Sequence, residues 1–281
     1  MKSILRKILL LTVVIFTAAV SHAQILTLDQ KKYNIDSLRA EFDRGPYFGL
    51  YKDNYFIFGT AVGPKPTREN TNVKFQISIR QKLTKSTLPW GTYLYLFYSQ
   101  KVFWNVLEKS MPMTDLNFNP GIGLGKTLFL KNRFIGQLTL QLEHESNGRD
   151  SIQSRSWNKV SVGATILVSP NLSVHGKFWI PIIDGENNRD ILKYCGIFQG
   201  GMTYTSHNKR WGGALTLVKR SGWNLSYNTI VELYYKLTKD QNQYLFMQYY
   251  NGYGEGLLDY KQFHSELRVG IVIKPRLFSE Y

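Results

Sequence analysis

The stretch QLTLQLEHESNGRDSIQSRSWNKVSVGA, residues 137–164, holds two runs of alternating apolar and polar residues joined by a polar segment. The apolar residues of the first run share their parity with His144, and those of the second run share theirs with Asn158. Side chains alternate between the two faces of a strand. The pattern therefore predicts two successive strands that carry His144 and Asn158 on their apolar faces, with Ser146 in the loop just past the first strand.

The same alternation recurs along the chain and predicts twelve strands. They are expected at residues 46–60, 73–83, 91–101, 117–128, 133–144, 158–168, 171–182, 196–205, 211–219, 224–236, 243–252 and 264–274. The alternation alone fits a soluble sandwich as well as a membrane barrel. Long connections after most odd-numbered strands and short turns after most even-numbered ones favour an outer-membrane barrel. Since hydrocarbon requires every backbone amide to be paired, we predict an all-β, twelve-stranded antiparallel transmembrane β-barrel.

The N-terminal segment carries an export signal. Three basic residues precede an apolar run, which is followed by Ser21-His22-Ala23 with small residues at its first and third positions. This order is typical of a signal peptide cleaved near Ala23. The alternative, a membrane anchor, needs a longer apolar stretch. We expect a signal peptide over residues 1–23, a polar periplasmic arm over residues 24–45 and the barrel over residues 46–281.

The chain is strongly basic. Its formal net charge is +15, and removal of Lys2, Arg6 and Lys7 with the signal peptide leaves +12. An exported protein rarely meets nucleic acid, so anionic lipid headgroups or lipopolysaccharide are the expected partners of this charge. Cys195 is the single cysteine and forms no internal disulfide; we interpret it as a small packed residue.

The hairpin formed by the two runs brings Asn158 back beside His144. A serine hydroxyl needs a base to become a nucleophile, and an imidazole is a suitable base when a third group fixes its tautomer. A histidine close in sequence to a serine is common in loops that have no catalytic role. A histidine and an asparagine left idle on a lipid-facing wall would be costly, however, and this favours a catalytic interpretation.

Two motifs in this stretch resemble the signature of the outer membrane phospholipase A family. They are HESNGR at residues 144–149 and SRSWN at residues 154–158. Segments at residues 73–76, 98–101, 190–194 and 249–260 are also similar to that family. The resemblance implies an enzyme of the bacterial outer membrane that hydrolyses phospholipid acyl esters with A1/A2 specificity. It leaves the cleavage of lysophospholipids open.

The resemblance also implies roles for individual residues. Ser146 corresponds to the nucleophile, His144 to the base and Asn158 to the group that orients the base. Gly148 corresponds to the position whose backbone N–H contributes to the oxyanion hole.

The family resemblance further implies a calcium cofactor and a homodimer as the active form. The calcium ligands would be the side chain of Ser110 and the backbone carbonyls of Arg149 and Ser154, and Gln100 would lie near the site or the dimer contact. Two alternatives remain open from the residues themselves. The barrel could be a non-enzymatic pore or transporter, or a binding module that uses its long basic loops.

Overall fold

The computed structural model describes residues 35–130, 133–182, 186–222, 224–238 and 242–275, which belong to one compact unit. The expected signal peptide and residues 24–34 of the expected arm lie outside these ranges. The remainder of the arm forms a helix, α2 (Ile35–Arg44). None of the helices in the described ranges combines the length and apolar character needed to cross a membrane.

Antiparallel strands make up most of the described chain. The strands are β1 (Phe48–Leu50), β2 (Asn54–Ala61), β3 (Thr71–Lys82), β4 (Thr92–Trp104), β5 (Met113–Leu130), β6 (Arg133–Ser146), β7 (Ser156–Leu167), β8 (Leu172–Ile182), β9 (Phe198–Thr205), β10 (Trp211–Lys219), β11 (Tyr227–Lys236), β12 (Gln243–Tyr253) and β13 (Phe263–Ile273). Short helical turns are η1 (Pro89–Gly91), η2 (Ser151–Gln153), η3 (Glu186–Asn188) and α3 (Leu192–Cys195).

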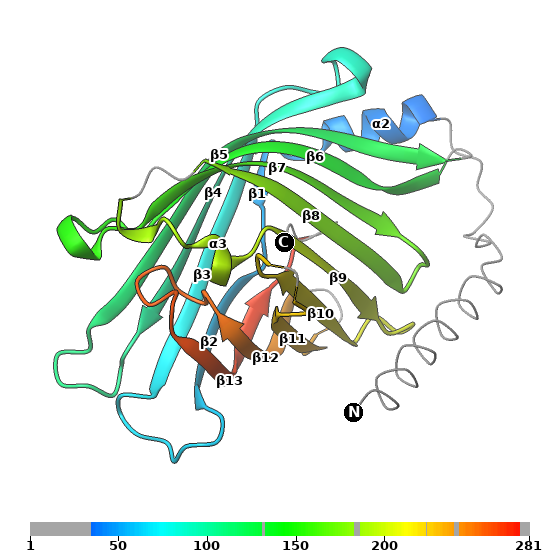
Figure 1. Ribbon diagram of the computed structural model, residues 1–281. Coiled ribbons are helices and arrows are strands. Elements are labelled where there is room, and N and C mark those ends of the chain that lie inside the picture. Colours follow the sequence, from blue (N-terminus) through cyan, green and yellow to red (C-terminus); the bar gives the residue numbers. More distant parts are fainter. Residues whose placement is uncertain (1–34, 131–132, 183–185, 223, 239–241, 276–281) are drawn as a thin grey trace, which may run out of the picture. The chain divides into compact units, whose positions relative to one another are not determined.

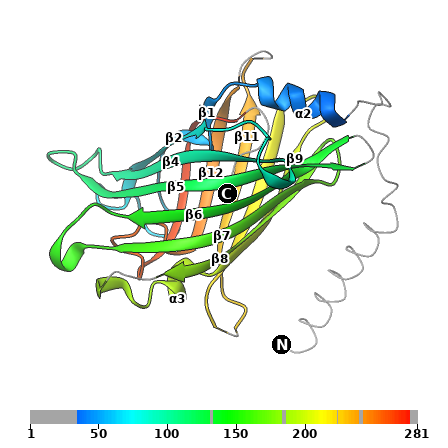
Figure 2. The same ribbon diagram turned by 90° about the horizontal axis from the view of Figure 1, so that it is seen from above.

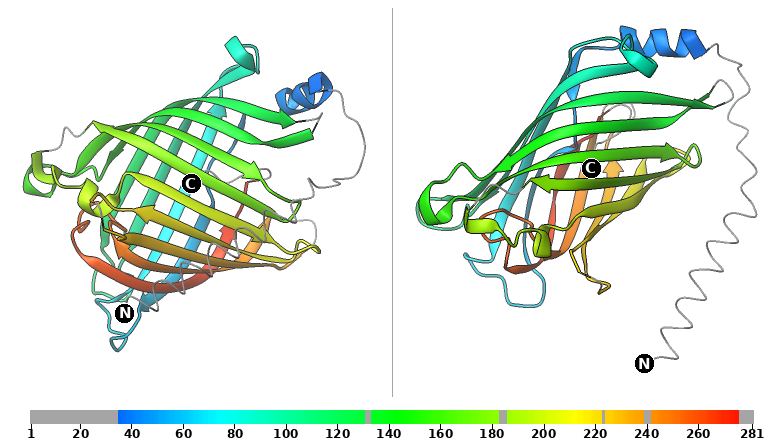
Figure 3. Two further views of the ribbon diagram at one scale, coloured as in Figure 1. Left: turned by 45° about the vertical axis from the view of Figure 1, so that its right-hand side comes forward. Right: turned by 45° about the horizontal axis from the view of Figure 1, so that its top comes forward.

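The sheet closes on itself into a barrel (Figures 1 and 3). From β2 to β13 each strand pairs with the next, and β13 pairs back with β2. The short β1 and the longer β2 pair with successive parts of β3, so together they occupy the place of one strand. The barrel therefore has the twelve strands that the sequence predicts, and closure leaves no unpaired edge.

One predicted strand is interrupted. Residues 46–60 were expected to be continuous, but the chain leaves the sheet between β1 and β2 at residues 51–53. Tyr51 turns into the barrel, where it is 1% exposed and stacks on Phe97 with a ring separation of 4.4 Å. Its hydroxyl accepts a hydrogen bond from Gln141 Nε2 at 2.6 Å. These contacts with β4 and β6 draw Tyr51 out of register, and local alternation does not reveal them.

The distribution of side chains is the reverse of that in a soluble domain. On β6, Leu138, Leu140 and Leu142 are 40–52% exposed, whereas Gln141 and Glu143 are 2% exposed. Apolar side chains on the outside and polar ones inside are what a lipid-facing wall and a polar lumen require. The prediction that the apolar face of this strand points outward is confirmed, and a soluble sandwich is excluded.

Several charged side chains in the lumen form ion pairs. Glu255, from the connection between β12 and β13, accepts hydrogen bonds from Lys74 Nζ at 3.0 Å and from Arg268 Nη1 at 2.7 Å. Lys177 Nζ lies 2.7 Å from Glu143 Oε1. Buried charges are tolerated when they are paired in this way, so these contacts fill the lumen and brace its wall.

The longer connections gather at one end of the barrel and α2 lies at the other (Figure 2). The connection at residues 254–262 folds inward, and its Leu257 and Tyr260 pack against Trp157, Trp179 and Ile191 in one buried cluster. Asp115 Oδ2 accepts hydrogen bonds from the backbone N–H groups of Leu257 and Leu258 at 2.8 and 3.0 Å. This connection therefore supports the β6–β7 hairpin from inside the barrel.

Three glycines of β5 make room for large rings of β4. A Cβ on Gly121 would lie 2.2 Å from Phe97 Cζ and 2.8 Å from the Leu142 carbonyl oxygen, distances that real Cβ atoms do not reach. The register places each ring opposite a glycine. The pairs are Phe97 with Gly121, Tyr95 with Gly123, and Tyr93 with Gly125. All three glycines therefore lie within the strand and are part of its packing against β4.

We predict that Gly121→Ala lowers the free energy of unfolding by about 1–3 kcal/mol, the usual result of overpacking a filled interior. The measurement is urea unfolding in lipid vesicles, followed by tryptophan fluorescence. Gly49→Ala is the matched control, because no atom lies within 4 Å of its added Cβ. Equal stability of the two variants would contradict the packing role of Gly121.

Candidate functional site

His144 and Asn158 form a directly opposed pair on the β6–β7 hairpin. Opposed residues of antiparallel strands point to the same face, which here is the outer, apolar one. His144 Nδ1 and Asn158 Oδ1 lie 2.9 Å apart. An amide oxygen only accepts hydrogen bonds, so this contact places the imidazole proton on Nδ1 and leaves Nε2 as a base.

Ser146 is the last residue of β6, which corrects the expectation that it lies in the loop. The ladder continues through the pairs Glu145↔Trp157 and Ser146↔Ser156 before the chain turns at Asn147. Residues two apart on a strand are separated by about 6.6 Å and share a face, so Ser146 lies beside His144 on the outer wall. Its hydroxyl forms no hydrogen bond with another residue in the described ranges.

Gln100 belongs to the same outer surface. Cross-strand pairing links Gln100 of β4 to Phe118 of β5, and Phe118 to Ser146 of β6. Two strand spacings separate Gln100 from Ser146, which is about 9.6 Å. The side chain of Gln100 accepts a hydrogen bond from Tyr98 at 3.1 Å. The structure thus brings Gln100 into the row of residues that contains Ser146, although it does not place the two in contact.

Asn147 organises the loop at residues 147–155, a role that the sequence did not reveal. Its side chain is 2% exposed. Its Nδ2 donates to the Gln153 carbonyl at 2.9 Å, and its Oδ1 accepts from the Arg155 N–H at 3.0 Å. Its backbone N–H donates to the Arg155 carbonyl at 3.0 Å. One buried asparagine therefore holds both ends of the loop together.

Gly148 follows directly and has a φ of 64°. This left-handed conformation favours glycine, and a Cβ here would lie 2.7 Å from Phe118 Cε2. A side chain is therefore excluded for two reasons. The backbone turns sharply at this point, immediately after Ser146 and Asn147, which is a geometry suited to presenting a backbone N–H.

The candidate calcium ligands are neutral oxygens. The carbonyl of Arg149 accepts no hydrogen bond from the described residues, whereas the carbonyl of Ser154 accepts one from Arg155 Nη1 at 2.8 Å. A carbonyl has two lone pairs, so the oxygen of Ser154 keeps one free. Calcium binds hydroxyl and carbonyl oxygens, so these donor types fit it.

Ser110 lies in the connection at residues 105–112, with a φ of 79°. The guanidinium of Arg149 reaches the end of that connection, where Nη2 donates to the Thr114 carbonyl at 2.6 Å. This bond ties the loop at residues 147–155 to the strand that follows Ser110. No group of three or more His, Cys, Asp or Glu side chains placed to hold a metal occurs among the described residues.

The contacts and burial of Asp190 and Cys195 are those of residues with a structural role. Asp190 accepts a hydrogen bond from Tyr260 at 2.5 Å and an ion pair from Lys261 at 2.9 Å. Partial burial raises the pKa of Asp190, but these two partners outweigh that effect and lower it. Burial raises the pKa of the Cys195 thiol to about 12, so the thiol stays protonated and is a poor nucleophile.

Asn188 is a second residue that sequence reasoning missed. It is fully buried, and its side-chain amide exchanges two hydrogen bonds with the backbone of Ser156, at 3.2 and 2.9 Å. Asn188 therefore fixes the strand opposite Ser146. It follows the expected strand by several residues and belongs to no motif, so only the folded arrangement shows its role.

Comparison with known proteins identifies the family and supports the fold. A family model described as Phospholipase A1 matches residues 50–273. The chain is 31% identical over 241 residues to Phospholipase A1 of Escherichia coli strain K12, with 79% of this chain and 80% of the relative covered. It is 29% identical over 242 residues to Phospholipase A1 of Proteus vulgaris, with 79% of this chain and 80% of the relative covered.

Two solved structures are also similar over the barrel. Outer membrane phospholipase A from Escherichia coli superposes with a TM-score of 0.71 at 26% identity, covering 85% of this chain and 96% of the other. The calcium-bound dimer of the Salmonella typhi outer membrane phospholipase gives a TM-score of 0.70 at 27% identity, again covering 85% of this chain and 96% of the other. The similarity therefore extends through most of the described fold.

We predict that Asn147→Ala opens the loop at residues 147–155. Loss of two buried side-chain hydrogen bonds, each contributing about 1 kcal/mol, raises the population of the opened loop roughly 30-fold. Trypsin should then cleave after Arg149 or Arg155 faster by a similar factor, as followed by mass spectrometry under conditions where cleavage tracks the open population. Asp150→Ala is the control, since that side chain makes no capping bond in the same loop; comparable cleavage of both variants would argue against the role of Asn147.

Proposed function

Because the chain belongs to the phospholipase A1 family of carboxylic ester hydrolases, whose barrel spans the outer membrane, we propose that it is a calcium-dependent phospholipase with A1/A2 specificity. It cleaves the acyl esters of phospholipids with Ser146, His144 and Asn158. The observation that carries this proposal is the 2.9 Å contact between His144 and Asn158 on the lipid-facing wall, with Ser146 on the same face of β6.

The proposed reaction follows from the chemistry of these groups. Ser146 Oγ attacks the ester carbonyl carbon while His144 Nε2 accepts the hydroxyl proton. The tetrahedral intermediate places a negative charge on the former carbonyl oxygen, and the N–H of Gly148 donates to it. The imidazolium then protonates the leaving lysophospholipid oxygen, and the acyl–serine ester forms. A water molecule, deprotonated by His144, attacks the carbonyl carbon of this ester. The bond to Ser146 Oγ then breaks, the imidazolium returns its proton to Oγ, and the fatty acid is released.

Asn158 acts in this scheme by orientation. Its oxygen holds the imidazole in the tautomer that presents Nε2 to Ser146. A neutral amide does not stabilise an imidazolium as a carboxylate would. It is, however, far less costly than a carboxylate on a wall that faces hydrocarbon. The lipid environment thus gives a physical reason for an amide at this position.

Calcium would be held by the hydroxyl of Ser110 and the carbonyls of Arg149 and Ser154. When bound there, calcium supplies positive charge that favours the developing oxyanion. The bond from Arg149 to Thr114 supports this assignment, because it ties the loop at residues 147–155 to the start of β5, directly after the connection that carries Ser110.

Dimerisation is the proposed means of activation. His144, Ser146 and Gln100 occupy an open convex wall, which by itself cannot enclose an acyl chain. A second protomer placed against the same wall would supply the other side of a cleft. The Salmonella typhi relative crystallised as a dimer with bound calcium, which supports the same assembly here. We expect activity to rise when dimers form in the outer leaflet.

A non-enzymatic pore or transporter is the second candidate. The described lumen argues against it, because paired charges such as Lys74–Glu255 and Lys177–Glu143 occupy the interior. The inward-folded connection at residues 254–262 adds Leu257 and Tyr260 to the same obstruction. We therefore favour the phospholipase.

We predict that Ser146→Ala and His144→Ala each reduce phospholipid hydrolysis by at least about 1,000-fold, because each removes a reacting group. Asn158→Ala should lose about 100-fold or less, because it disturbs orientation alone. The measurement is fatty-acid release from mixed micelles with calcium. Ser156→Ala, which removes a hydroxyl from the position opposite Ser146, should retain activity. Full activity of any of the first three variants would reject the role assigned to that residue.

We predict that a chelator abolishes hydrolysis and that calcium restores it. Ser110→Ala should raise the calcium concentration for half-maximal activity at least about tenfold, because it removes a ligand atom. Ser154→Ala should leave that concentration nearly unchanged, since its proposed ligand is the backbone carbonyl. The calcium dependence of initial rates distinguishes the two serines, and identical curves for both variants would refute the assignment of Ser110.

A further inference from the structure

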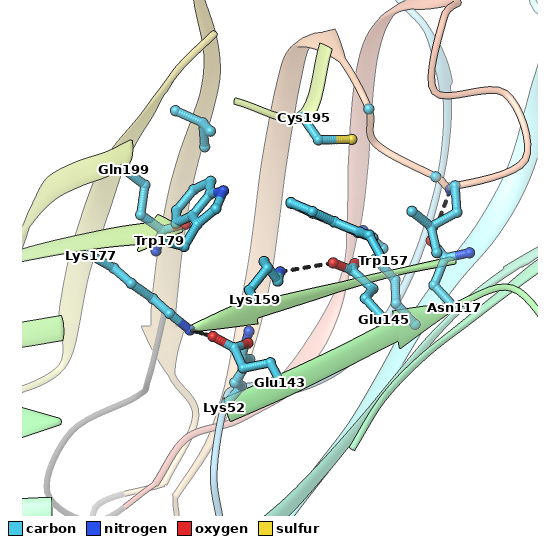
Figure 4. A pocket seen from close by; sticks show the side chains of 15 residues that line it. Lys52, Asn117, Glu143, Glu145, Trp157, Lys159, Lys177, Trp179, Cys195 and Gln199 are labelled. Atoms are coloured by element: carbon cyan, nitrogen blue, oxygen red, sulfur yellow. Dashed lines mark hydrogen bonds and ion pairs between the residues drawn. The ribbon is translucent and has the colours of Figure 1, made fainter. Parts of the chain in front are cut away.

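A polar pocket of 170 Å³ lies in the lumen behind the β6–β7 hairpin (Figure 4). Glu143, Glu145, Trp157 and Lys159 line it from the two strands that carry His144 and Asn158 on their opposite faces. The inward-folded connection contributes Leu257. The pocket is therefore separated from the proposed catalytic groups by the thickness of one sheet and forms a distinct site.

The lining carries an excess of positive charge. Four lysines and two glutamates face the pocket. Lys177 pairs with Glu143 at 2.7 Å and Lys159 with Glu145 at 2.9 Å, as the dashed lines in Figure 4 show. The remaining two, Lys52 and Lys101, form no ion pair with any residue in the described ranges. The lining therefore holds two more lysines than glutamates, and neither Lys52 nor Lys101 has a carboxylate within ion-pair distance among these side chains.

The pocket also has unused hydrogen-bond donors. The indole Nε1–H of Trp157 and the amide Nδ2 of Asn117 belong to side chains that are 2% and 3% exposed. Both atoms are buried and have no hydrogen-bond partner within the described structure. Glu143 Oε1 already receives Lys177 and the hydroxyl of Ser161, and Glu145 Oε2 receives Lys159. The two buried N–H donors are therefore available to a ligand that carries acceptor atoms.

We propose that this pocket binds a small tetrahedral oxyanion, either inorganic phosphate or the phosphate of a small phosphomonoester. Water can satisfy an N–H group, but it does not neutralise two ammonium groups in the poorly solvated interior of the barrel. An oxyanion supplies both negative charge and several acceptors, and charge-assisted hydrogen bonds to lysine are strong. The volume exceeds that of several water molecules, so such an anion fits with some of its hydration.

Binding of phosphate to the full-length protein in neutral detergent provides the test. Isothermal calorimetry should show one saturable site when sodium chloride is replaced by sodium phosphate at constant ionic strength. Lys52→Gln and Lys101→Gln should each weaken this binding at least about tenfold, because each removes one of the uncompensated charges. Trp157→Phe keeps the ring and removes the N–H, and it should also weaken binding.

Lys193→Gln is the matched control, because Lys193 is exposed on α3 and does not line the pocket. It should bind phosphate like the unmodified chain. Circular dichroism of each variant distinguishes loss of the binding site from loss of the fold. If Lys52→Gln does not fold, the phosphate affinity of Lys101→Gln alone tests the role of the lysines. A parallel titration with glycerol 3-phosphate distinguishes inorganic phosphate from a phosphomonoester as the ligand. Saturable binding of glycerol 3-phosphate without binding of inorganic phosphate assigns the site to a phosphomonoester.

Two results would overturn the proposal. One is the absence of saturable binding for both phosphate and glycerol 3-phosphate. The other is equal affinity in Lys101→Gln, Trp157→Phe and Lys193→Gln, which would mean that any bound anion lies elsewhere. Neither result depends on hydrolytic activity, so the proposed phospholipase function is tested separately.

Discussion

Every backbone amide of a membrane-spanning chain must find a partner within the protein, and this constraint determines the rest of the structure. A closed antiparallel ladder meets it, and the ladder then assigns every residue to one of two faces. On β6 the assignment sends Glu143 into the lumen and His144 to the lipid. The same ladder opposes Asn158 to His144, and their 2.9 Å contact follows from the strand register without help from any loop. The position of His144 and Asn158 side by side on the outer wall is therefore a consequence of backbone pairing.

The polar lumen is the other consequence. Many inward-facing polar side chains are buried, and several of them pair with one another. Glu255 joins Lys74 and Arg268, while Asp115 holds the backbone of Leu257. Lys74 and Asp115 are far in sequence from the connection at residues 254–262, so their contacts with it resist deformation of the wall. The hairpin with the proposed catalytic groups is thus supported from behind by the lumen, and its outer face is turned to the membrane.

The sequence was sufficient for features that depend on local alternation. It predicted the number of strands, the faces of β6 and β7, and the proximity of His144 and Asn158. It failed where distant contacts decide. The break at Tyr51 depends on Phe97 and Gln141, and the loop-closing role of Asn147 depends on burial. The alternation placed Ser146 in a loop, which was wrong. Pairing of Ser146 with Ser156 extends the strand beyond its last clearly apolar residue.

The location of the site explains why it would need a partner. An enzyme that acts on small molecules usually encloses them in a concave pocket. Here neither the lumen pocket nor the larger cavity of 690 Å³ beside α2 includes His144, Ser146 or Asn158 in its lining. In the proposed function the substrate therefore reaches these groups from the membrane, along the apolar wall. A convex wall positions the reacting groups but leaves an acyl chain free on one side, and a facing protomer would remove that freedom. Since orientation contributes a large part of the rate of an intramolecular reaction, the proposed dimerisation would raise the rate by supplying this orientation.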